Sequence, residues 1–306
     1  MKITIEKAYS FHQNGNRDNQ EDSRFPDNDV VSNGNFFVVC DGVGGAEKGE
    51  VASSIVCKTI GSKLADKNVS NTEITVSDIS EIVDAAYDAL DEMAEKNPET
   101  ADMGTTLTLL CLHKGGAISV HIGDSRIYQF RRNYGCIFKT EDHSLVNNLV
   151  KNGLISPEEA INHPQRNVIT RAMSPTSGKE RRSMVTISFL SDIKAGDYFL
   201  LCSDGVIGEL SDQQLYDTLL GEGSDEEKVA KMAKLSENAD DNNTAFIVPI
   251  AKVTPLTGEQ EGPSETKAHS TTHPLPQKLI KTFDIESIKK PNKKKSAFAR
   301  FFDMFK

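Results

Sequence analysis

The stretch Val38-Val39-Cys40-Asp41-Gly42-Val43-Gly44-Gly45 decides how the fold of this chain is interpreted. An apolar run typical of a buried strand ends there at an aspartate, and a glycine follows at once. The pattern returns in Leu200-Leu201-Cys202-Ser203-Asp204-Gly205-Val206. A strand end holds its side chain on a rigid backbone, and the glycine lets other groups approach closely. Two such carboxylates would repel each other and lose hydration, and a divalent cation between them reverses that cost.

Three further segments place acidic side chains beside predicted strands. They are Arg17-Asp18-Asn19-Gln20-Glu21-Asp22-Ser23, Gly123-Asp124-Ser125-Arg126 and Asn238-Ala239-Asp240-Asp241-Asn242-Asn243-Thr244. Singly, each is most often a turn or a solvated ion pair. Together with the two strand ends they indicate one shared site for Mg²⁺ or Mn²⁺. The two ions are not distinguished, because both take carboxylate and water ligands.

Hydrophobic periodicity predicts an α+β protein with antiparallel sheets covered by helices. Strands are predicted at Ile3–Phe11, Phe36–Asp41, Thr105–His113, Ala117–Ile122, Arg126–Phe130, Met184–Leu190, Tyr198–Ser203 and Thr244–Ile250. Helices are predicted at Val51–Leu64, Ile79–Ala94, Leu145–Lys151, Pro157–Asn162, Asp212–Leu219 and Asp225–Leu235. The strands cluster as hairpins and do not alternate regularly with helices, which favours antiparallel sheets.

Composition divides the chain into a predicted folded domain over 1–251, a flexible linker over 252–288 and a basic amphipathic tail over 289–306. The linker is rich in Pro, Thr, Ser, Gly and Glu and has too few apolar residues to bury. In the tail, four phenylalanines follow a lysine run at the spacing of one helix face: Phe298, Phe301, Phe302 and Phe305. We expect the tail to bind either an anionic membrane surface or a groove on a protein partner.

The charge distribution argues against a nucleic-acid ligand, because phosphate contacts need a basic face. The formal net charge is -10, and the residues from Lys278 onward carry +6, so the rest carries -16. The five cysteines have no CxxC spacing, and we expect reduced, buried thiols. The N-terminus has no signal-peptide pattern, and no apolar run reaches the roughly 20 residues of a membrane span. We therefore expect a cytoplasmic protein, which its tail could hold at the inner face of the membrane.

The order of these motifs resembles the metal-dependent protein serine/threonine phosphatases of the PP2C (PPM) family, in their compact bacterial form. The resemblance covers about residues 1–250. Its pieces, in order, are Asn16-Arg17 through Glu21-Asp22, Asp41-Gly42-Val43-Gly44-Gly45 with Gly49-Glu50-Val51-Ala52-Ser53, Met103-Gly104-Thr105-Thr106, His121-Ile122-Gly123-Asp124-Ser125-Arg126, Thr140-Glu141-Asp142-His143-Ser144, Leu201-Cys202-Ser203-Asp204-Gly205 and Asp241-Asn242-Asn243-Thr244. Seven pieces in one order make a specific match. The implied fold is an antiparallel β-sandwich flanked by helices on both faces.

The resemblance also implies a role for each acidic residue at the metal site. Asp41 would bridge two ions, Mn²⁺ or Mg²⁺, with the carbonyl of Gly42 on one of them. Asp204 and Asp241 would complete the ligands of the other ion. Asp124, together with Asp204, resembles the pair that holds a third, weaker ion in bacterial members.

Three further residues would serve catalysis in such a phosphatase. Glu21 and Asp22 would fix metal-bound waters, and Arg17 would grip the substrate phosphate. The implied reaction is direct attack of a metal-bridged hydroxide on phosphoserine or phosphothreonine of proteins that a Ser/Thr kinase has modified. Val43 stands where eukaryotic members have a histidine acid, so a metal-bound water is expected to protonate the leaving alkoxide.

Two regions keep a functional and a structural interpretation side by side. The segment 145–178 resembles the mobile flap of the family, but a helix pair packed on the sheet would explain its apolar residues equally well. His143 lies in a family motif, where a structural hydrogen bond is the commoner role. His121 alternates with apolar residues on a strand, and core packing is expected. Gly104-Thr105-Thr106 is interpreted as close packing beside the metal site.

Other hydrolase classes fit the sequence less well. Asp27-Asn28-Asp29-Val30-Val31 fits the motif of haloacid-dehalogenase phosphatases, but the buried strand that should precede it is missing. None of the cysteines has the arginine six residues later that cysteine-based phosphatases need. A pseudophosphatase that only binds phosphoproteins would have lost a metal aspartate or the phosphate arginine, and these residues are present.

Overall fold

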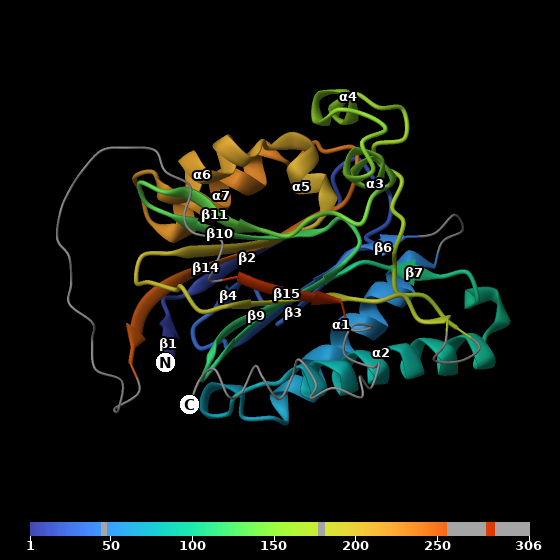
Figure 1. Cartoon of the computed structure of the whole chain (residues 1–306), viewed down its shortest axis with the longest axis horizontal. Coiled ribbons are helices and arrows are strands. Elements are labelled where there is room, and N and C mark those ends of the chain that lie inside the picture. Colours follow the sequence, from blue (N-terminus) through green and yellow to red (C-terminus); the bar gives the residue numbers. More distant parts are fainter. Residues whose placement is uncertain (44–47, 177–180, 256–279, 285–306) are drawn as a thin grey trace.

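The computed structural model describes residues 1–43, 48–176 and 181–255, together with the backbone of 280–284. Two antiparallel sheets lie face to face in the middle of the molecule (Figure 1). Helices α1 (Gly49–Ala65) and α2 (Val76–Lys96) cover the outer face of one sheet, while α5 (Asp204–Glu209), α6 (Asp212–Leu220) and α7 (Asp225–Leu235) cover the other. The predicted α+β sandwich with helices on both faces is confirmed.

The sheet under α5, α6 and α7 has the strand order β11-β10-β13-β14-β2-β4, and β1 also pairs with β14. Its strands are β11 (Gly135–Lys139), β10 (Arg126–Arg131), β13 (Tyr198–Cys202), β14 (Asn243–Thr254), β2 (Ala8–Gln13), β4 (Val30–Val31) and β1 (Lys2–Ile5). Two of the predicted metal aspartates lie at the same end of this sheet, since Asp204 follows the end of β13 and Asp241 precedes the start of β14.

The sheet above α1 and α2 has the order β15-β12-β9-β8-β5-β3. Its strands are β15 (Ile280–Asp284), β12 (Thr186–Leu190), β9 (Gly116–Ile122), β8 (Leu107–His113), β5 (Phe36–Cys40) and β3 (Ser23–Phe25). A short ribbon pairs β6 (Gly42–Val43) with β7 (Gly104–Thr105), and the remaining elements are α3 (Leu145–Lys151), α4 (Pro157–Ile161), η1 (Val69–Asn71) and η2 (Pro98–Thr100). Asp41 and Asp124 follow the ends of β5 and β9, so both sheets deliver carboxylates to the same end of the sandwich.

Apolar side chains from the two sheets interlock between them. Phe37 of β5 and Phe246 of β14 are buried there with ring centroids 5.2 Å apart, and Val39 and Leu110 belong to the same cluster. Full burial of such a side chain contributes roughly 1.5–3 kcal/mol. This packing fixes the spacing of the sheets and with it the spacing of the aspartates at their ends.

The structure differs from the sequence prediction at several elements. The single strand predicted over Ile3–Phe11 is two strands, β1 and β2, and the pairing register of β1 with β14 shifts between Thr4 and Ile5. Strand β11 and helix α5 were not predicted; α5 is short and contains two glycines, which lower helix propensity. Four of the cysteines are buried as expected, but Cys136 is exposed, because β11 forms an edge of its sheet.

Two strands contain residues beyond 251, where the predicted domain ends. Strand β14 continues to Thr254, and residues 280–284 within the predicted linker form strand β15 against β12. The rest of the predicted linker and the whole of the tail over 289–306 lie outside the described residues. Among the described residues, no helix is both long and apolar enough to cross a membrane.

Candidate metal centre

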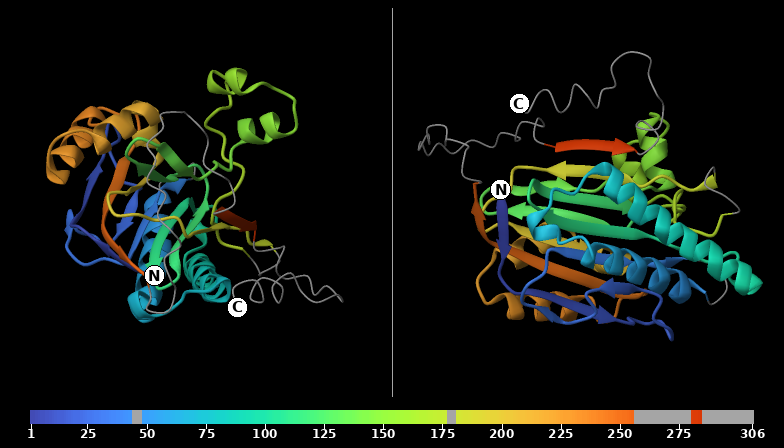
Figure 2. Two further views of the ribbon diagram at one scale, coloured as in Figure 1. Left: turned by 60° about the vertical axis from the view of Figure 1, so that its left-hand side comes forward. Right: turned by 90° about the horizontal axis from the view of Figure 1, so that it is seen from below.

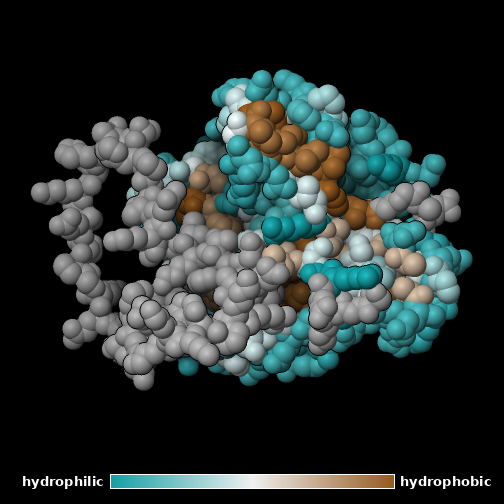
Figure 3. All heavy atoms as spheres, turned by 45° about the vertical axis from the view of Figure 1, so that its right-hand side comes forward, coloured by the Kyte–Doolittle hydropathy of each residue, from teal (hydrophilic) through white to brown (hydrophobic). Residues whose placement is uncertain are grey.

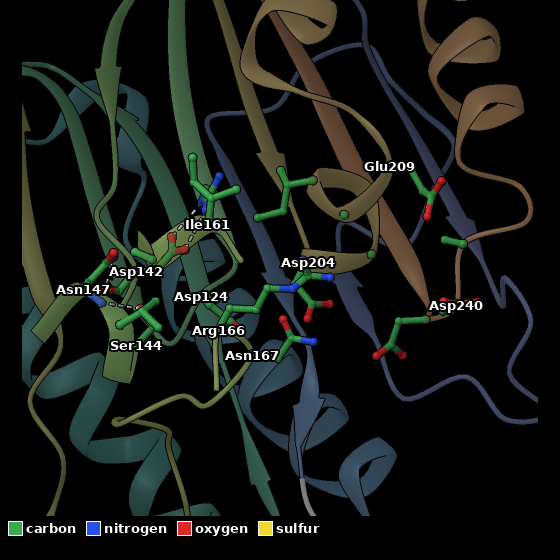
Figure 4. Close-up of a pocket in the computed structure, with 18 of the residues that line it drawn as sticks. Asp124, Asp142, Ser144, Asn147, Ile161, Arg166, Asn167, Asp204, Glu209 and Asp240 are labelled. Carbon is green, nitrogen blue, oxygen red and sulfur yellow. Dashed lines mark hydrogen bonds and ion pairs between the residues drawn. The ribbon is translucent and has the colours of Figure 1, made fainter. Parts of the chain in front are cut away.

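A cavity of about 730 Å³ opens at the end of the sandwich where the aspartates leave the sheets. Asp124, Asp204 and Asp241 line it together with Arg17, and residues of α3 and α4 form another wall. Figure 4 shows Asp124 and Asp204 gathered in its middle with Arg166 and Asn167, between Asp142 on one side and Glu209 and Asp240 on the other. Side chains that are far apart in the sequence therefore line one cavity.

The backbone of Asp41 is clamped by two neighbouring threonines. Its N–H donates to Thr106 Oγ1 (3.0 Å), and its carbonyl accepts from the Thr106 N–H (2.8 Å) and from Thr105 Oγ1 (2.9 Å). Both threonines are fully buried. The expected packing role of the Gly-Thr-Thr motif thus takes a specific form, because these contacts hold the backbone from which the Asp41 side chain projects.

The glycines after the two strand ends are required by close backbone crossings. A Cβ on Gly42 would lie 2.4 Å from the carbonyl of Gly49, and one on Gly205 would lie 2.2 Å from the carbonyl oxygen of Asn242. Real Cβ atoms do not approach backbone so closely, and neither partner is a side chain that could turn away. The Asp-Gly pairs therefore let chain segments cross directly behind Asp41 and Asp204.

Burial and mutual repulsion raise the pKa of the clustered carboxyl groups. Burial first, and then the charges of Asp204 and Asp241, raise the pKa of Asp22 to about 7. Burial and the charge of Asp204 likewise raise the pKa of Asp124 to about 7. The pKa of Asp41 lies well above its ordinary value, through burial and then the charges of Asp22, Asp204 and Asp124. Such a cluster is electrostatically incomplete without a cation.

Two buried oxygen atoms point to the same conclusion. In the part of the chain that the structure describes, Asp22 Oδ1 and Asp204 Oδ1 are buried without a hydrogen-bond partner. The second oxygen of Asp22 accepts from Ser203 Oγ at 2.8 Å, so the side chain is anchored on one side only. Carboxylate oxygens with free lone pairs are the donors that Mg²⁺ and Mn²⁺ prefer, and the residues therefore fit such ions.

The side chains are not yet turned toward a common point. Among the described residues, no group of three or more His, Cys, Asp or Glu side chains is arranged to hold a metal ion. Asp241 accepts from the Arg17 guanidinium (2.8 Å), and Asp41 lies close enough to Asp204 for the two charges to interact. The assignment of individual ligands therefore stays a prediction.

Arg17 lines the cavity beside Asp241, and Glu21 lies close enough to both for their charges to act on it. Arg17 Nε also donates to the carbonyl of Asp240 (3.1 Å), and the side chain is 52% exposed. Burial and the nearby charge of Glu50 raise the pKa of Glu21. The roles of Arg17 in binding phosphate and of Glu21 in positioning water stay predictions.

Sequence reasoning assigned no role to Asn242, which ties the acidic segments together. Its Oδ1 accepts from the Glu21 N–H (2.7 Å), and its Nδ2 donates to the carbonyls of Asn14 and Asn19 (2.9 Å each). Ser203 has a similar function, since its Oγ donates to Asp22 and accepts from the Thr244 N–H (3.0 Å). Both residues lie inside the motifs of the sequence analysis, and this was the only indication in the sequence that they could support the site.

The turn that carries Asp124 is braced by His143. The Gly123 N–H donates to His143 Nδ1 (3.2 Å), and the His143 N–H donates to the Gly123 carbonyl (2.8 Å). His121 stacks on His143 with ring centroids 4.6 Å apart, and His121 is buried as expected. Both histidines therefore have structural contacts behind the cavity.

The predicted flap is a pair of helices that stands out from the sandwich beside the cavity (Figure 1). Helix α3 begins with Ser144 as its N-cap and α4 with a capping box at Ser156. Leu154 and Ile161 are 69% and 67% exposed, and Val168 is also exposed. Figure 3 shows apolar side chains gathered in the upper part of the molecule, where these helices lie. Gating by this segment stays a prediction.

The alternative dehalogenase motif lies away from the cavity. Asp27 and Asp29 are exposed side chains that both contact the guanidinium of Arg24. Neither is among the residues that line the cavity of the clustered aspartates. The arrangement gives no support to a nucleophilic role for Asp27.

Comparisons with known proteins agree with the motifs. Residues 11–238 match the family described as "Protein phosphatase 2C". The serine/threonine protein phosphatase PstP of Mycobacterium tuberculosis is 36% identical over 204 residues, which are 66% of this chain but only 36% of that protein. The protein phosphatase PhpP of Streptococcus pneumoniae is 30% identical over 218 residues, 70% of this chain and 85% of that protein.

A solved structure matches over most of the chain. The catalytic domain of the serine/threonine protein phosphatase PstP, in complex with two manganese ions, superposes with a TM-score of 0.66 at 28% identity. The match covers 81% of this chain and 100% of that one.

Proposed function

The chain belongs to the protein phosphatase 2C family, and from that premise we propose that it is a metal-dependent phosphatase that hydrolyses phosphoserine and phosphothreonine in proteins. The observation that carries the proposal is the convergence of Asp124, Asp204 and Asp241 with the Arg17 guanidinium at one cavity. The buried carboxyl group of Asp41 lies close enough to these aspartates for their charges to raise its pKa. A phosphate monoester is a dianion, so its hydrolysis requires positive charge at the site of attack.

In this proposal Asp41, Asp204, Asp241 and the Gly42 carbonyl hold two divalent ions, Mn²⁺ or Mg²⁺, and Asp124 with Asp204 holds a third, weaker one. The two manganese ions in the PstP structure support the number of core ions. Bound ions of this kind supply a nucleophile at neutral pH and polarise the phosphoryl oxygens. The clamped backbone at Asp41 and the crossings behind Gly42 and Gly205 keep the carboxylates in place for that purpose.

Arg17 is the residue that this chain offers to the substrate. Its side chain is half exposed at the cavity and is held from one side by Asp241 and the Asp240 carbonyl. A guanidinium binds two phosphate oxygens in a fork, which orients the phosphoryl group for in-line displacement. Glu21 and Asp22 would orient water beside it, and Val43 offers no proton to the leaving group.

The partners are proposed to be phosphoproteins that a Ser/Thr kinase has modified. For the tail over 289–306 we keep two proposals, an anionic membrane surface and a groove on a protein partner, because its lysine run and phenylalanine spacing suit both. Binding to a membrane would make the enzyme peripheral at the inner face.

Phosphate release from a phosphothreonine peptide tests the proposed activity. We expect turnover by the full chain with Mn²⁺ and none after chelation. Asp204→Asn is expected to lose activity by about two orders of magnitude or more, because one ligand is lost and charge in the cavity changes. Asp27→Asn is the matched control and should keep full activity. Metal-independent turnover, or full activity of Asp204→Asn, would refute the mechanism.

A further inference from the structure

Strand β15 lies outside the part of the chain that matches the family, yet it is part of the sandwich. It pairs with β12 in antiparallel register, with Asp284 opposite Thr186 and Ile280 opposite Leu190. Figure 2 shows β15 in red beside β12 at the edge of its sheet. Without it, β12 would itself be the edge strand and would expose a row of unpaired backbone groups.

The register places the C-terminal end of β15 at the end of β12 that faces the metal centre. Thr186 is the first residue of β12, and its other neighbour across the sheet is His121 of β9. Two residues after His121, β9 gives way to the turn of Gly123 and Asp124. The last pair of the β15–β12 ladder is therefore one strand away from that turn.

Hydrogen bonds connect Thr186 to the turn through one ring. The Gly123 N–H donates to His143 Nδ1 (3.2 Å), which requires a free lone pair on that nitrogen. The ring proton is thus assigned to Nε2, which donates to Thr186 Oγ1 at 3.0 Å. Stacking on His121 holds the ring in plane. His143 acts as a rigid spacer between the first residue of β12 and the residue before Asp124.

We propose that β15 is a cis-acting strand that, by pairing with β12, uses Thr186 and the positioning residue His143 to hold the Gly123–Asp124 turn in the geometry that the cavity needs. Release of β15 would loosen Thr186 at the end of an edge strand, and the Gly123 amide would lose its ordered acceptor. The C-terminal segment could then tune the affinity of the Asp124 side of the cavity for a divalent ion. Only this last step rests on the proposed function.

Proline substitutions in the full chain test the proposal. In a strand, neighbouring amides point to opposite sides, so Lys281→Pro with Thr282→Pro removes one donor to β12 whichever amide faces it. The control variant, Thr271→Pro with Thr272→Pro, introduces two prolines in the segment that precedes β15. Amide hydrogen exchange of Gly123 and His143, measured without metal, is the first readout. The second is the Mn²⁺ concentration for half-maximal phosphatase activity.

We expect the double proline variant at 281 and 282 to lose protection in β12 and also at Gly123. Its half-maximal Mn²⁺ concentration should rise on the order of 3- to 10-fold. Thr186→Val, which removes the hydroxyl but keeps the shape, should reproduce both changes, while Thr186→Ser should behave as the unaltered chain. If the proline variant does not fold, the comparison of Thr186→Val with Thr186→Ser tests the proposal.

Unchanged exchange at Gly123 after loss of protection in β12, or in Thr186→Val, overturns the proposal. Unchanged amide exchange in β12 of the proline variant also overturns the proposal, since β15 would then not stabilise the edge of the sheet. The exchange readout needs no catalysis. A chain without phosphatase activity whose Gly123 amide still responds to β15 would contradict the proposed function and leave this coupling standing.

Discussion

Arg17 Nη2 donates to Asp241 Oδ2 at 2.8 Å, so the predicted phosphate-binding residue is paired with a predicted metal ligand. The two side chains are 52% and 38% exposed. A pair this open to solvent adds only about 0–1 kcal/mol to stability. In the proposed mechanism, an ion that binds Asp241 would release the guanidinium to bind the substrate phosphate.

Arg17→Lys should therefore impair catalysis and leave stability almost unchanged. A lysine keeps the charge but cannot bind two phosphate oxygens in a fork, and we expect kcat/KM to fall about 10- to 100-fold. Steady-state kinetics with a phosphopeptide and thermal unfolding measure the two effects. Arg132→Lys, in the turn between β10 and β11, is the control and should change neither. A kinetic effect matched by a large drop in Tm would mean that Arg17 acts by supporting the fold.

The glycines of α5 make a matched pair. A Cβ on Gly205 would lie 2.2 Å from the Asn242 carbonyl oxygen, whereas no described atom lies within 4 Å of the Cβ position at Gly208. Gly205→Ala should push Asp204 out of place, with an overpacking cost of about 1–3 kcal/mol and loss of most activity. Gly208→Ala should instead stabilise the helix by about 0.5–1 kcal/mol and keep activity. Urea unfolding and phosphate release check both. Equal behaviour of the two variants would show that the crossing behind Asp204 tolerates a side chain.

The tail prediction is tested with vesicles. If residues 289–306 bind an anionic surface, the full chain should pellet with vesicles that contain an anionic lipid, while a chain ending at Ile288 should stay in the supernatant. Each lysine near such a surface contributes about 1 kcal/mol, and salt screens the attraction. Pelleting should therefore fall at high ionic strength and be absent with neutral vesicles. Equal pelleting of the two chains removes the membrane proposal and leaves the protein partner.

The apolar pattern predicted antiparallel sheets covered by helices, because its strands cluster as hairpins. The sandwich itself was implied by the resemblance of the ordered motifs to the protein phosphatase 2C family. Asp41 and Asp204 each follow a buried strand, and each is followed by a glycine whose Cβ would meet the backbone of another segment. The elements that were missed lack such a signal. Helix α5 begins at Asp204 itself and packs on β14, where Gly205 meets Asn242 and Asn243, a contact distant in the sequence that periodicity does not show.

The site was predictable as a set of residues and not as a network. Which carboxylates converge followed from the order of the motifs, and the structure brings them together. That Asn242 joins Glu21 to two backbone carbonyls, or that Ser203 anchors Asp22, depends on side-chain directions that only the packed sheets define. Strand β15 was assigned to a linker, because its pairing with β12 depends on a distant edge and its five residues have no flanking pattern.

The raised pKa values of the clustered carboxyl groups make the stability of the fold depend on pH, and a bound divalent ion would change that dependence. The folded-state pKa is about 7 for both Asp22 and Asp124, above the ordinary 3.8, so the folded state keeps protons that the unfolded chain has lost. Stability from these groups falls as pH rises from about 4 to about 7, and Asp41, whose pKa also lies well above its ordinary value, adds to the fall. His143 acts in the opposite direction, because burial lowers its pKa from 6.5 to about 3, but that contribution is complete above about pH 6.5.

Without divalent ions, Tm should therefore decrease between about pH 6.5 and 8. With Mn²⁺ in excess the decrease should shrink, because an ion that binds the carboxylates stabilises the form that the high pH produces. The gain in Tm from Mn²⁺ should then be larger at pH 8 than at pH 5, where protons compete for the same oxygen atoms. Thermal unfolding with and without Mn²⁺ measures this gain. The histidines affect Tm equally in both measurements, so they do not change the difference. Asp124→Asn removes one titrating group, so its metal-free Tm should fall less steeply with pH. A gain that is the same at both pH values would show that the ions do not bind where the carboxylates titrate.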